Sequence, residues 1–112
     1  MKENISLELD NLVKEIRNSS NIKVVYLFGS YAYGKPHAES DLDICIIAED
    51  KSLRKIDIIK NVRKAISKVA TMPIDLIVYY SDEFKERSNI KFTMEHQISN
   101  HGVKLYEQIK NL

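Results

Sequence analysis

Two aspartates stand one residue apart in an apolar segment of the chain, Asp41–Ala48 (DLDICIIA). If this segment is a β-strand, Asp41 and Asp43 point to the same face, together with Cys45 and Ile47, and lie about 6–7 Å apart. Two carboxylates at that distance repel each other and resist desolvation, so they require a nearby cation or water. Mg²⁺ suits them best, because it prefers carboxylate oxygens and keeps coordination positions open for water and phosphate.

Asp75 adds a third carboxylate near the start of another apolar segment, Ile74–Tyr80 (IDLIVYY). Pro73 precedes this segment, and proline is typical of the first residue of a strand. If the two strands are neighbours, all three aspartates meet on one face of the sheet. The sequence therefore predicts a carboxylate metal site made by Asp41, Asp43 and Asp75.

A glycine and a serine precede these aspartates and favour phosphate binding. Gly29-Ser30 follows an apolar, β-branched run, Lys23–Phe28 (KVVYLF), which is typical of a strand. A glycine leaves the backbone N–H groups open to a phosphate, and the Ser30 hydroxyl is a further donor. Gly34 allows the chain to turn again. A phosphate site beside a carboxylate metal site is the arrangement that phosphoryl or nucleotidyl transfer needs.

Hydrophobic periodicity and turn residues predict the elements that position these groups. We expect helices over residues 4–18, 51–69 and 90–100, a further helix after Ser81, strands over 23–28, 41–48 and 74–80, and a short edge strand over 103–106. Asp50 or Ser52 is expected to cap the second helix, Ser81 to cap the next, and Gly102 to end the last. The alternation of strands and helices predicts an α/β or α+β fold.

The second helix is expected to bury a stripe of apolar side chains at helical spacing. The members of this stripe are Leu53, Ile56, Ile59, Val62, Ile66 and Val69. The remaining residues of the helix are mostly basic, which is typical of a solvated face and less often of a nucleic-acid surface.

Composition limits the possible classes of protein. The chain has 112 residues, 44% of them hydrophobic and 29% charged, and a net charge of +1. These values predict one globular domain over residues 1–112, and a net charge so near neutral argues against a dedicated nucleic-acid binder. No apolar run reaches the roughly 20 residues of a membrane span, and the start lacks the pattern of a signal peptide. A single cysteine, Cys45, cannot form an internal disulfide, so we expect a cytoplasmic protein in which Cys45 is a small buried apolar residue.

The motifs above resemble those of a known superfamily. Gly29-Ser30, ten further residues and then Asp41-Leu42-Asp43 resemble the signature of the nucleotidyltransferases related to DNA polymerase beta, and Asp75 matches their third carboxylate. The short chain is similar to the minimal nucleotidyltransferases, which are often encoded beside HEPN-domain proteins in toxin–antitoxin pairs. The segment Ile98–Tyr106 (ISNHGVKLY) resembles a tail common in that group. The resemblance implies a polymerase beta-like core, a small mixed sheet of three or four strands flanked by helices.

The resemblance also implies roles for single residues. It makes Asp41 and Asp43 ligands of two Mg²⁺ ions, with Mn²⁺ as a substitute, and Asp75 a ligand of one ion that helps to activate the acceptor hydroxyl. It places the nucleotide, ATP or another nucleoside triphosphate, against Gly29 and Ser30. It further implies an antitoxin that forms a complex with a HEPN-domain partner and transfers AMP to a tyrosine of that partner.

One residue departs from the pattern of the resemblance. Tyr33 stands where many members have an arginine that could reach phosphate, and a tyrosine offers only a neutral hydroxyl. Lys35 or His37, in the same loop, could supply the missing charge, and we assign Lys35 to nucleotide binding. Two functions therefore remain open: an active nucleotidyltransferase, or a protein of little or no activity that neutralises its partner by forming a complex. We expect His96 and His101, like His37, to be surface residues rather than zinc ligands.

Overall fold

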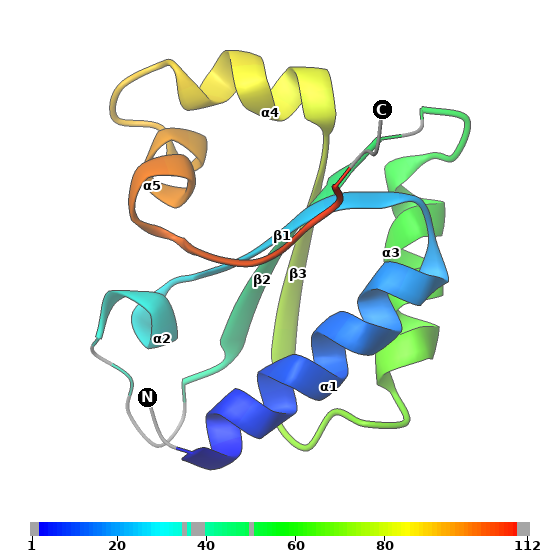
Figure 1. Ribbon diagram of the computed structural model, residues 1–112. Coiled ribbons are helices and arrows are strands. Elements are labelled where there is room, and N and C mark those ends of the chain that lie inside the picture. The colour runs from blue at the N-terminus through cyan, green and yellow to red at the C-terminus, as the bar shows by residue number, and fades with distance from the viewer. Residues whose placement is uncertain (1–2, 35, 37–39, 50, 110–112) are drawn as a thin grey trace.

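The computed structural model describes residues 3–34, 36, 40–49 and 51–109. In chain order its elements are α1 (Glu3–Ser19), β1 (Ile22–Phe28), α2 (Ser30–Tyr33), β2 (Leu42–Ala48), α3 (Lys55–Ile66), β3 (Ile74–Tyr80), α4 (Ser81–Ser88), α5 (Met94–His101) and β4 (Val103–Glu107) (Figure 1). Among the described residues, no helix is long and apolar enough to cross a membrane.

The strands form one mixed sheet in the order β3-β2-β1-β4. β1 pairs with β2 and with β4 in antiparallel fashion, whereas β2 and β3 run parallel and are connected through α3. The expected α/β fold with a small mixed sheet is therefore confirmed, including the short edge strand near residue 103. The parallel pair matters for the site, because it brings the beginnings of β2 and β3 to the same edge of the sheet.

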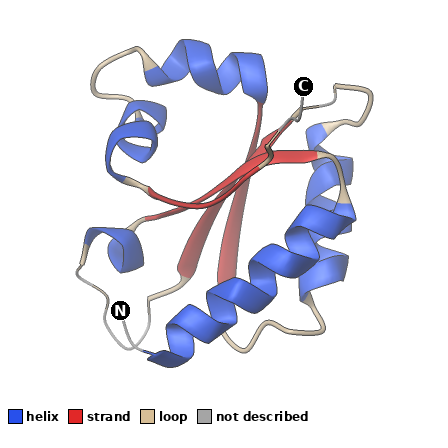
Figure 2. Cartoon of the chain, in the orientation of Figure 1, coloured by secondary structure: helices blue, strands red, loops and turns tan. Residues whose placement is uncertain are grey.

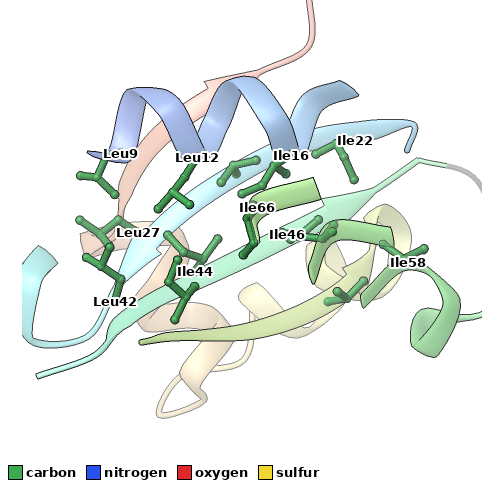
Figure 3. Close-up of a cluster of buried hydrophobic side chains, with 14 of the residues drawn as sticks. Leu9, Leu12, Ile16, Ile22, Leu27, Leu42, Ile44, Ile46, Ile58 and Ile66 are labelled. Carbon is green, nitrogen blue, oxygen red and sulfur yellow. The ribbon is translucent and has the colours of Figure 1, made fainter. Parts of the chain in front are cut away.

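Helices cover both faces of the sheet: α1 and α3 lie on one face, and α4 and α5 lie on the other (Figures 1 and 2). The alternation of side chains along β2 divides the core accordingly. Leu42, Ile44 and Ile46 pack under α1 and α3 (Figure 3). Cys45 and Ile47 pack on the opposite face, in a second cluster whose other buried members are Val24, Tyr79, Phe84 and Ile98. The face expected for Asp43 is therefore the α4–α5 face.

The helix that was expected over residues 51–69 is α3, which is shorter than expected and buries a different set of apolar residues. It begins at Lys55 rather than near residue 51, and its N-cap is Arg54, which makes no side-chain capping bond. Ser52 therefore does not cap it, and Asp50 lies outside the described residues.

The buried residues of α3 are Ile58, Val62 and Ile66, whereas Leu53 and Ile56 are 38% and 48% exposed. Leu53 precedes the helix, where its carbonyl oxygen accepts a hydrogen bond from Tyr80 Oη at 2.6 Å. Ile56 lies two residues before Ile58, about 200° around the helix axis, and so points to solvent.

Three other boundaries differ slightly from expectation. β2 begins at Leu42, so Asp41 lies one residue before the strand. Ser81 is the first residue of α4 rather than its cap, and the preceding N–H, that of Tyr80, donates to Glu83 Oε1 at 3.3 Å. α5 begins only at Met94, because Thr93 caps it by accepting a hydrogen bond from the N–H of His96 at 3.1 Å.

Gly102 ends α5 as expected, but not through a left-handed backbone. Its φ is −65°, an ordinary value for any residue. A Cβ at this position would lie 2.6 Å from the carbonyl oxygen of Ile98 and 3.2 Å from that of Leu27. The glycine is therefore needed for space, since it lets the end of α5 approach β1 closely.

Candidate active site

Asp43 and Asp75 lie directly opposite each other on neighbouring strands. The parallel register of β2 and β3 pairs the two residues, and neighbouring strands are about 4.8 Å apart. Asp41 precedes the first residue of β2 and is half-buried, as is Asp43, while Asp75 is exposed. The expectation that the two strands are neighbours is confirmed, and the fold brings the three carboxylates to one edge of the sheet.

The carboxylates influence one another electrostatically. Burial is the largest cause that raises the pKa of Asp43, followed by the negative charges of Asp75 and Asp41 and a hydrogen bond with Asp75. A raised carboxyl pKa means that the ionised form is disfavoured in the folded protein. A cation near these groups would remove that penalty.

The donor set of this edge fits a divalent cation that is shared with a nucleotide. Among the described residues, no group of three His, Cys, Asp or Glu side chains forms a ready-made metal cage. Mg²⁺ rarely uses such a cage, because it usually binds one or two carboxylates together with waters and the phosphates of a substrate. Asp43 and Asp75 provide carboxylate oxygens of that kind, on two adjacent strands.

Gly29 is fitted to the Asp43 side chain. It directly follows β1, where Phe28 is paired with Asp43, and its backbone has φ +73° and ψ −159°. A Cβ on Gly29 would lie only 2.0 Å from Asp43 Oδ2. The sequence predicted a glycine that gives phosphate access to the backbone, and the structure adds a second reason, because any side chain here would displace the Asp43 carboxylate.

A one-turn helix follows Gly29, where the sequence had suggested only a turn. Ser30 is the first residue of α2, and the N–H groups of Ala32 and Tyr33 both donate to the carbonyl oxygen of Gly29 at 3.0 Å. Gly34 ends α2 with φ +84°, a left-handed conformation that favours glycine. Ser30 thus directly follows Gly29, the residue that lies against the Asp43 carboxylate. Lys35 and His37 lie outside the described residues.

The Tyr33 hydroxyl turns back towards Gly29 and Asp43. Burial is the main cause that raises the pKa of Tyr33; a hydrogen bond with the backbone of Gly29 opposes the rise, and the charge of Asp43 adds to it. The phenol therefore stays neutral at physiological pH. The residue that departs from the family pattern still presents a polar group to the site, but without the positive charge of an arginine.

A hollow of about 560 Å³ lies between α2 and α5. Its walls are formed by Ala32, Tyr33, Gly34, Gln97 and His101. The sequence did not predict this hollow, because α2 and α5 are far apart along the chain. Its size is within the range of small-molecule sites, about 300–1,000 Å³.

A polar network around one buried carboxylate lies farther along the same face of the sheet. Glu95 of α5 is 5% exposed and accepts a hydrogen bond from Arg87 Nε of α4 at 2.5 Å. Burial opposes its ionisation, but hydrogen bonds from Arg87, its own backbone and Tyr79 outweigh burial and lower the pKa of Glu95. This network was not predicted from the sequence. The sequence feature that could have indicated it is a glutamate three residues before Ile98, since this spacing places both side chains on the same, apolar side of a helix.

Cys45 is fully buried next to this network. Burial, and then the charge of Glu95, raises the pKa of its thiol to about 12. The thiol is therefore protonated at neutral pH, and only the thiolate is a good nucleophile. The prediction that Cys45 is a small apolar residue of the core is confirmed.

Two other sequence-based assignments can be compared with the structure. Within the described residues, part of the basic surface near α3 is neutralised by ion pairs: Lys51 with Asp82, Arg54 with Asp57, and Lys55 with Glu83. His101 is exposed, as expected. His96 was also expected at the surface, and this is only partly right. It is half-buried, and its Nδ1 lies 2.8 Å from the carbonyl oxygen of Ser88.

The family of the chain follows from comparing its sequence with known domains. Residues 9–100 match the nucleotidyltransferase domain family, so the chain belongs to this family. The chain is 40% identical over 45 residues to the protein adenylyltransferase MntA of Shewanella oneidensis. That match covers 39% of this chain and 32% of MntA, about a third of the curated relative.

Solved structures of similar fold include toxin–antitoxin complexes. A toxin–antitoxin crystallised with AMP-PNP aligns with a TM-score of 0.64 and 25% identity, over 89% of this chain and 73% of that chain. An MntA–HepT toxin–antitoxin aligns with a TM-score of 0.59 and 21% identity, over 92% of this chain and 73% of that chain. A nucleotidyltransferase-like protein of Sulfolobus solfataricus aligns with a TM-score of 0.55 and 24% identity, over 96% of this chain and 90% of that chain. At these identities the last two show the shared fold alone.

Proposed function

We propose that this chain is a metal-dependent nucleotidyltransferase that transfers AMP from ATP to a hydroxyl group of a protein. The observation that carries the proposal is the pairing of Asp43 with Asp75 across β2 and β3, with Gly29 held against the Asp43 carboxylate. Family membership agrees with this activity. We regard residues 1–112 as one catalytic domain that resides in the cytoplasm, where ATP is abundant.

Each candidate residue has a role in this proposal. Asp41, Asp43 and Asp75 hold Mg²⁺ or Mn²⁺, and two bound ions would neutralise phosphate charge and lower the pKa of the acceptor hydroxyl. Gly29 and Ser30 donate to the triphosphate, and we assign Lys35 to the same task.

The transfer itself exchanges one bond to phosphorus for another. The acceptor hydroxyl gives its proton to Asp75, and its oxygen forms a bond to the α-phosphorus. The bond between this phosphorus and the leaving oxygen breaks, and pyrophosphate departs.

We infer that the acceptor is a tyrosine of a HEPN-domain partner and that the modification inactivates this partner, as expected of an antitoxin. Three similar proteins support this assignment. MntA of Shewanella oneidensis is called a protein adenylyltransferase, one similar structure is a toxin–antitoxin with AMP-PNP, and another contains a tri-AMPylated HEPN toxin with its antitoxin. A tyrosine hydroxyl has an ordinary pKa of about 10, so it needs a metal ion or a base to become a nucleophile at neutral pH.

A second function is favoured by one observation, the neutral Tyr33 at the position where an arginine is common. A chain with weak nucleotide binding could still silence its partner by covering it in a complex. The two functions differ in one measurable property, since only the first changes the mass of the partner.

The deciding experiment is intact-mass spectrometry of the HEPN-domain partner that this proposal assigns to the chain. The partner is incubated with the wild-type chain, ATP and Mg²⁺, and we expect the mass of one or more AMP groups to be added. The Asp41→Ala/Asp43→Ala double variant is the control and should add none. A partner that stays unmodified, yet is silenced equally well by both proteins, would overturn the enzymatic function in favour of the covering complex.

A further inference from the structure

The loop that joins α4 to α5 and the first residue of α5 together expose three apolar side chains. Phe92 is 101% exposed, Ile90 is 51% exposed and Met94 is 44% exposed. We call residues 90–94 the α4–α5 loop; in Figure 1 it joins the yellow helix to the orange one, away from the sheet. Single exposed apolar residues are common, but neighbouring large ones are typical of a surface that meets another protein.

The backbone of Phe92 is strained. Its φ is +69°, and within the described residues it is the one non-glycine residue with a positive φ. This conformation costs an L-residue free energy, particularly one with a bulky side chain. The fully exposed ring makes up none of this cost by packing within the chain. Strain of this kind is concentrated at functional sites.

Hydrogen bonds hold the loop in this one shape. Thr93 Oγ1 lies 2.8 Å from the carbonyl oxygen of Ile90 and 3.2 Å from that of Arg87, and it accepts the N–H of His96. The N–H of Ile90 donates to the carbonyl oxygen of Arg87 at 3.0 Å. A side chain that is presented by a fixed loop loses little entropy on binding, which favours a docking role.

An exposed lysine, Lys91, directly precedes Phe92 in the loop, and a second, Lys85, lies on α4. Neither lysine forms an ion pair with a carboxylate in the part of the chain that the structure describes. Arg87, in contrast, is paired with Glu95. The charges complementary to this loop are therefore carboxylates on the rim of a partner's apolar pocket.

α5 connects the loop to the candidate active site. Met94 is its first residue and His101 is its last, so the helix is about 12 Å long. Gln97 and His101 line the hollow that Tyr33 borders from α2. A partner that holds Phe92 and extends along the exposed side of α5 would reach the edge of the sheet that carries Asp43.

We propose that the α4–α5 loop docks the acceptor protein, with Phe92 inserted into an apolar pocket that is rimmed by carboxylates. The loop acts outside the chemistry, by holding the acceptor hydroxyl where Asp43 and Asp75 can act on it. The identity of the occupant as the acceptor rests on the proposed function.

The test compares Phe92→Asn with two matched variants. Asparagine tolerates a positive φ, so this change removes the ring and keeps the loop shape. Phe92→Tyr keeps an aromatic ring, and Leu7→Gln removes an exposed apolar side chain from α1 on the opposite face of the sheet. Calorimetry measures the Kd for the HEPN-domain partner of the proposed function, and a separate titration measures the Kd for Mg²⁺-ATP.

We expect Phe92→Asn to weaken partner binding about tenfold or more, because it removes a whole aromatic ring from the contact. Phe92→Tyr should bind the partner more tightly than Phe92→Asn, Leu7→Gln should bind it like the wild type, and all variants should bind Mg²⁺-ATP equally. Partner binding that Phe92→Asn leaves unchanged would overturn the docking role. So would a wild-type dimer, seen by sedimentation, that Phe92→Asn dissociates, since the loop would then join two copies of this chain.

The failure of the proposed function would look different. If the wild type binds the partner but adds no AMP to it, the enzymatic function fails, and a tenfold effect of Phe92→Asn on the Kd still supports the docking surface.

Discussion

Replacing Gly29 with alanine should separate two effects that the structure places at one residue. The first is backbone strain. With φ +73° and ψ −159°, Gly29 occupies a region that is almost closed to other residues, at a cost of about 1–3 kcal/mol. A loss of about 2 kcal/mol should lower the Tm by roughly 8 °C, which thermal unfolding of the metal-free protein measures.

The second effect is a collision with the site. The new Cβ would be 2.0 Å from Asp43 Oδ2, so the carboxylate must move away from its place opposite Asp75. We expect Mg²⁺-ATP binding, measured by calorimetry, to weaken about 10–100-fold, as is common when the group that positions a metal ligand is changed.

Gly34→Ala is the matched control for strain. Gly34 also has a positive φ, +84°, but a Cβ there meets nothing within 4 Å. It should lose about 1–2 kcal/mol of stability and keep its nucleotide affinity. Equal losses of affinity in the two variants, or normal affinity in Gly29→Ala, would refute the assignment of Gly29 as the residue that makes space for Asp43.

Four further predictions follow from single residues. Asp43→Asn should raise the Tm of the metal-free protein at pH 7, because asparagine carries no charge. This gain in Tm should vanish as the pH falls through the raised pKa of Asp43, since the protonated carboxyl is then as neutral as the asparagine amide; a gain in Tm that is independent of pH would contradict this. Glu95→Gln should lower the unfolding free energy by about 1.5–3 kcal/mol at neutral pH, since it weakens the bond from Arg87. This difference in unfolding free energy should disappear in acid, as the pH falls from the pKa of Glu95 in the unfolded chain, about 4.3, through its lowered pKa in the folded protein. Denaturant unfolding of the wild type and the variant at several pH values measures the difference and its loss. Cys45 should react with a thiol reagent only after denaturation, and rapid labelling of the native protein would be inconsistent with a pKa of about 12. Phe92→Gly should stabilise the protein by about 1 kcal/mol in thermal unfolding, because it relieves the positive φ and removes no internal contact; a lower Tm would show that the ring packs within the chain.

Much of the fold could be predicted from local patterns. The apolar run Ile74–Tyr80 has the bounds of β3, and the amphipathic spacing over residues 4–18 matches α1 closely. The error at α3 has a physical cause. Leu53 and Ile56 fit a helical stripe by spacing, but the hydrogen bond from Tyr80 to Leu53 belongs to the contact between two elements, which periodicity does not describe.

The polar parts of the α4–α5 face could not be predicted for the same reason. Glu95 is buried because Arg87 and Tyr79 come to it from α4 and β3, and its cost of burial depends on partners that are distant in sequence or in another element. Phe92 could have been a core residue by composition. Only the path of the chain around Thr93 exposes its ring.

The sequence by itself determined which residues could do the chemistry. Asp41, Asp43 and Asp75 in apolar segments, and Gly29-Ser30 before them, are local features, and a carboxylate within an apolar strand is unusual in any fold. Their arrangement was decided only by the tertiary structure. The parallel pairing of β2 with β3 sets Asp75 opposite Asp43, and the antiparallel pairing of β1 with β2 sets Gly29 against the same carboxylate. Strand order and register depend on how α1 and α3 pack against the sheet as a whole, and no short stretch of sequence contains that information.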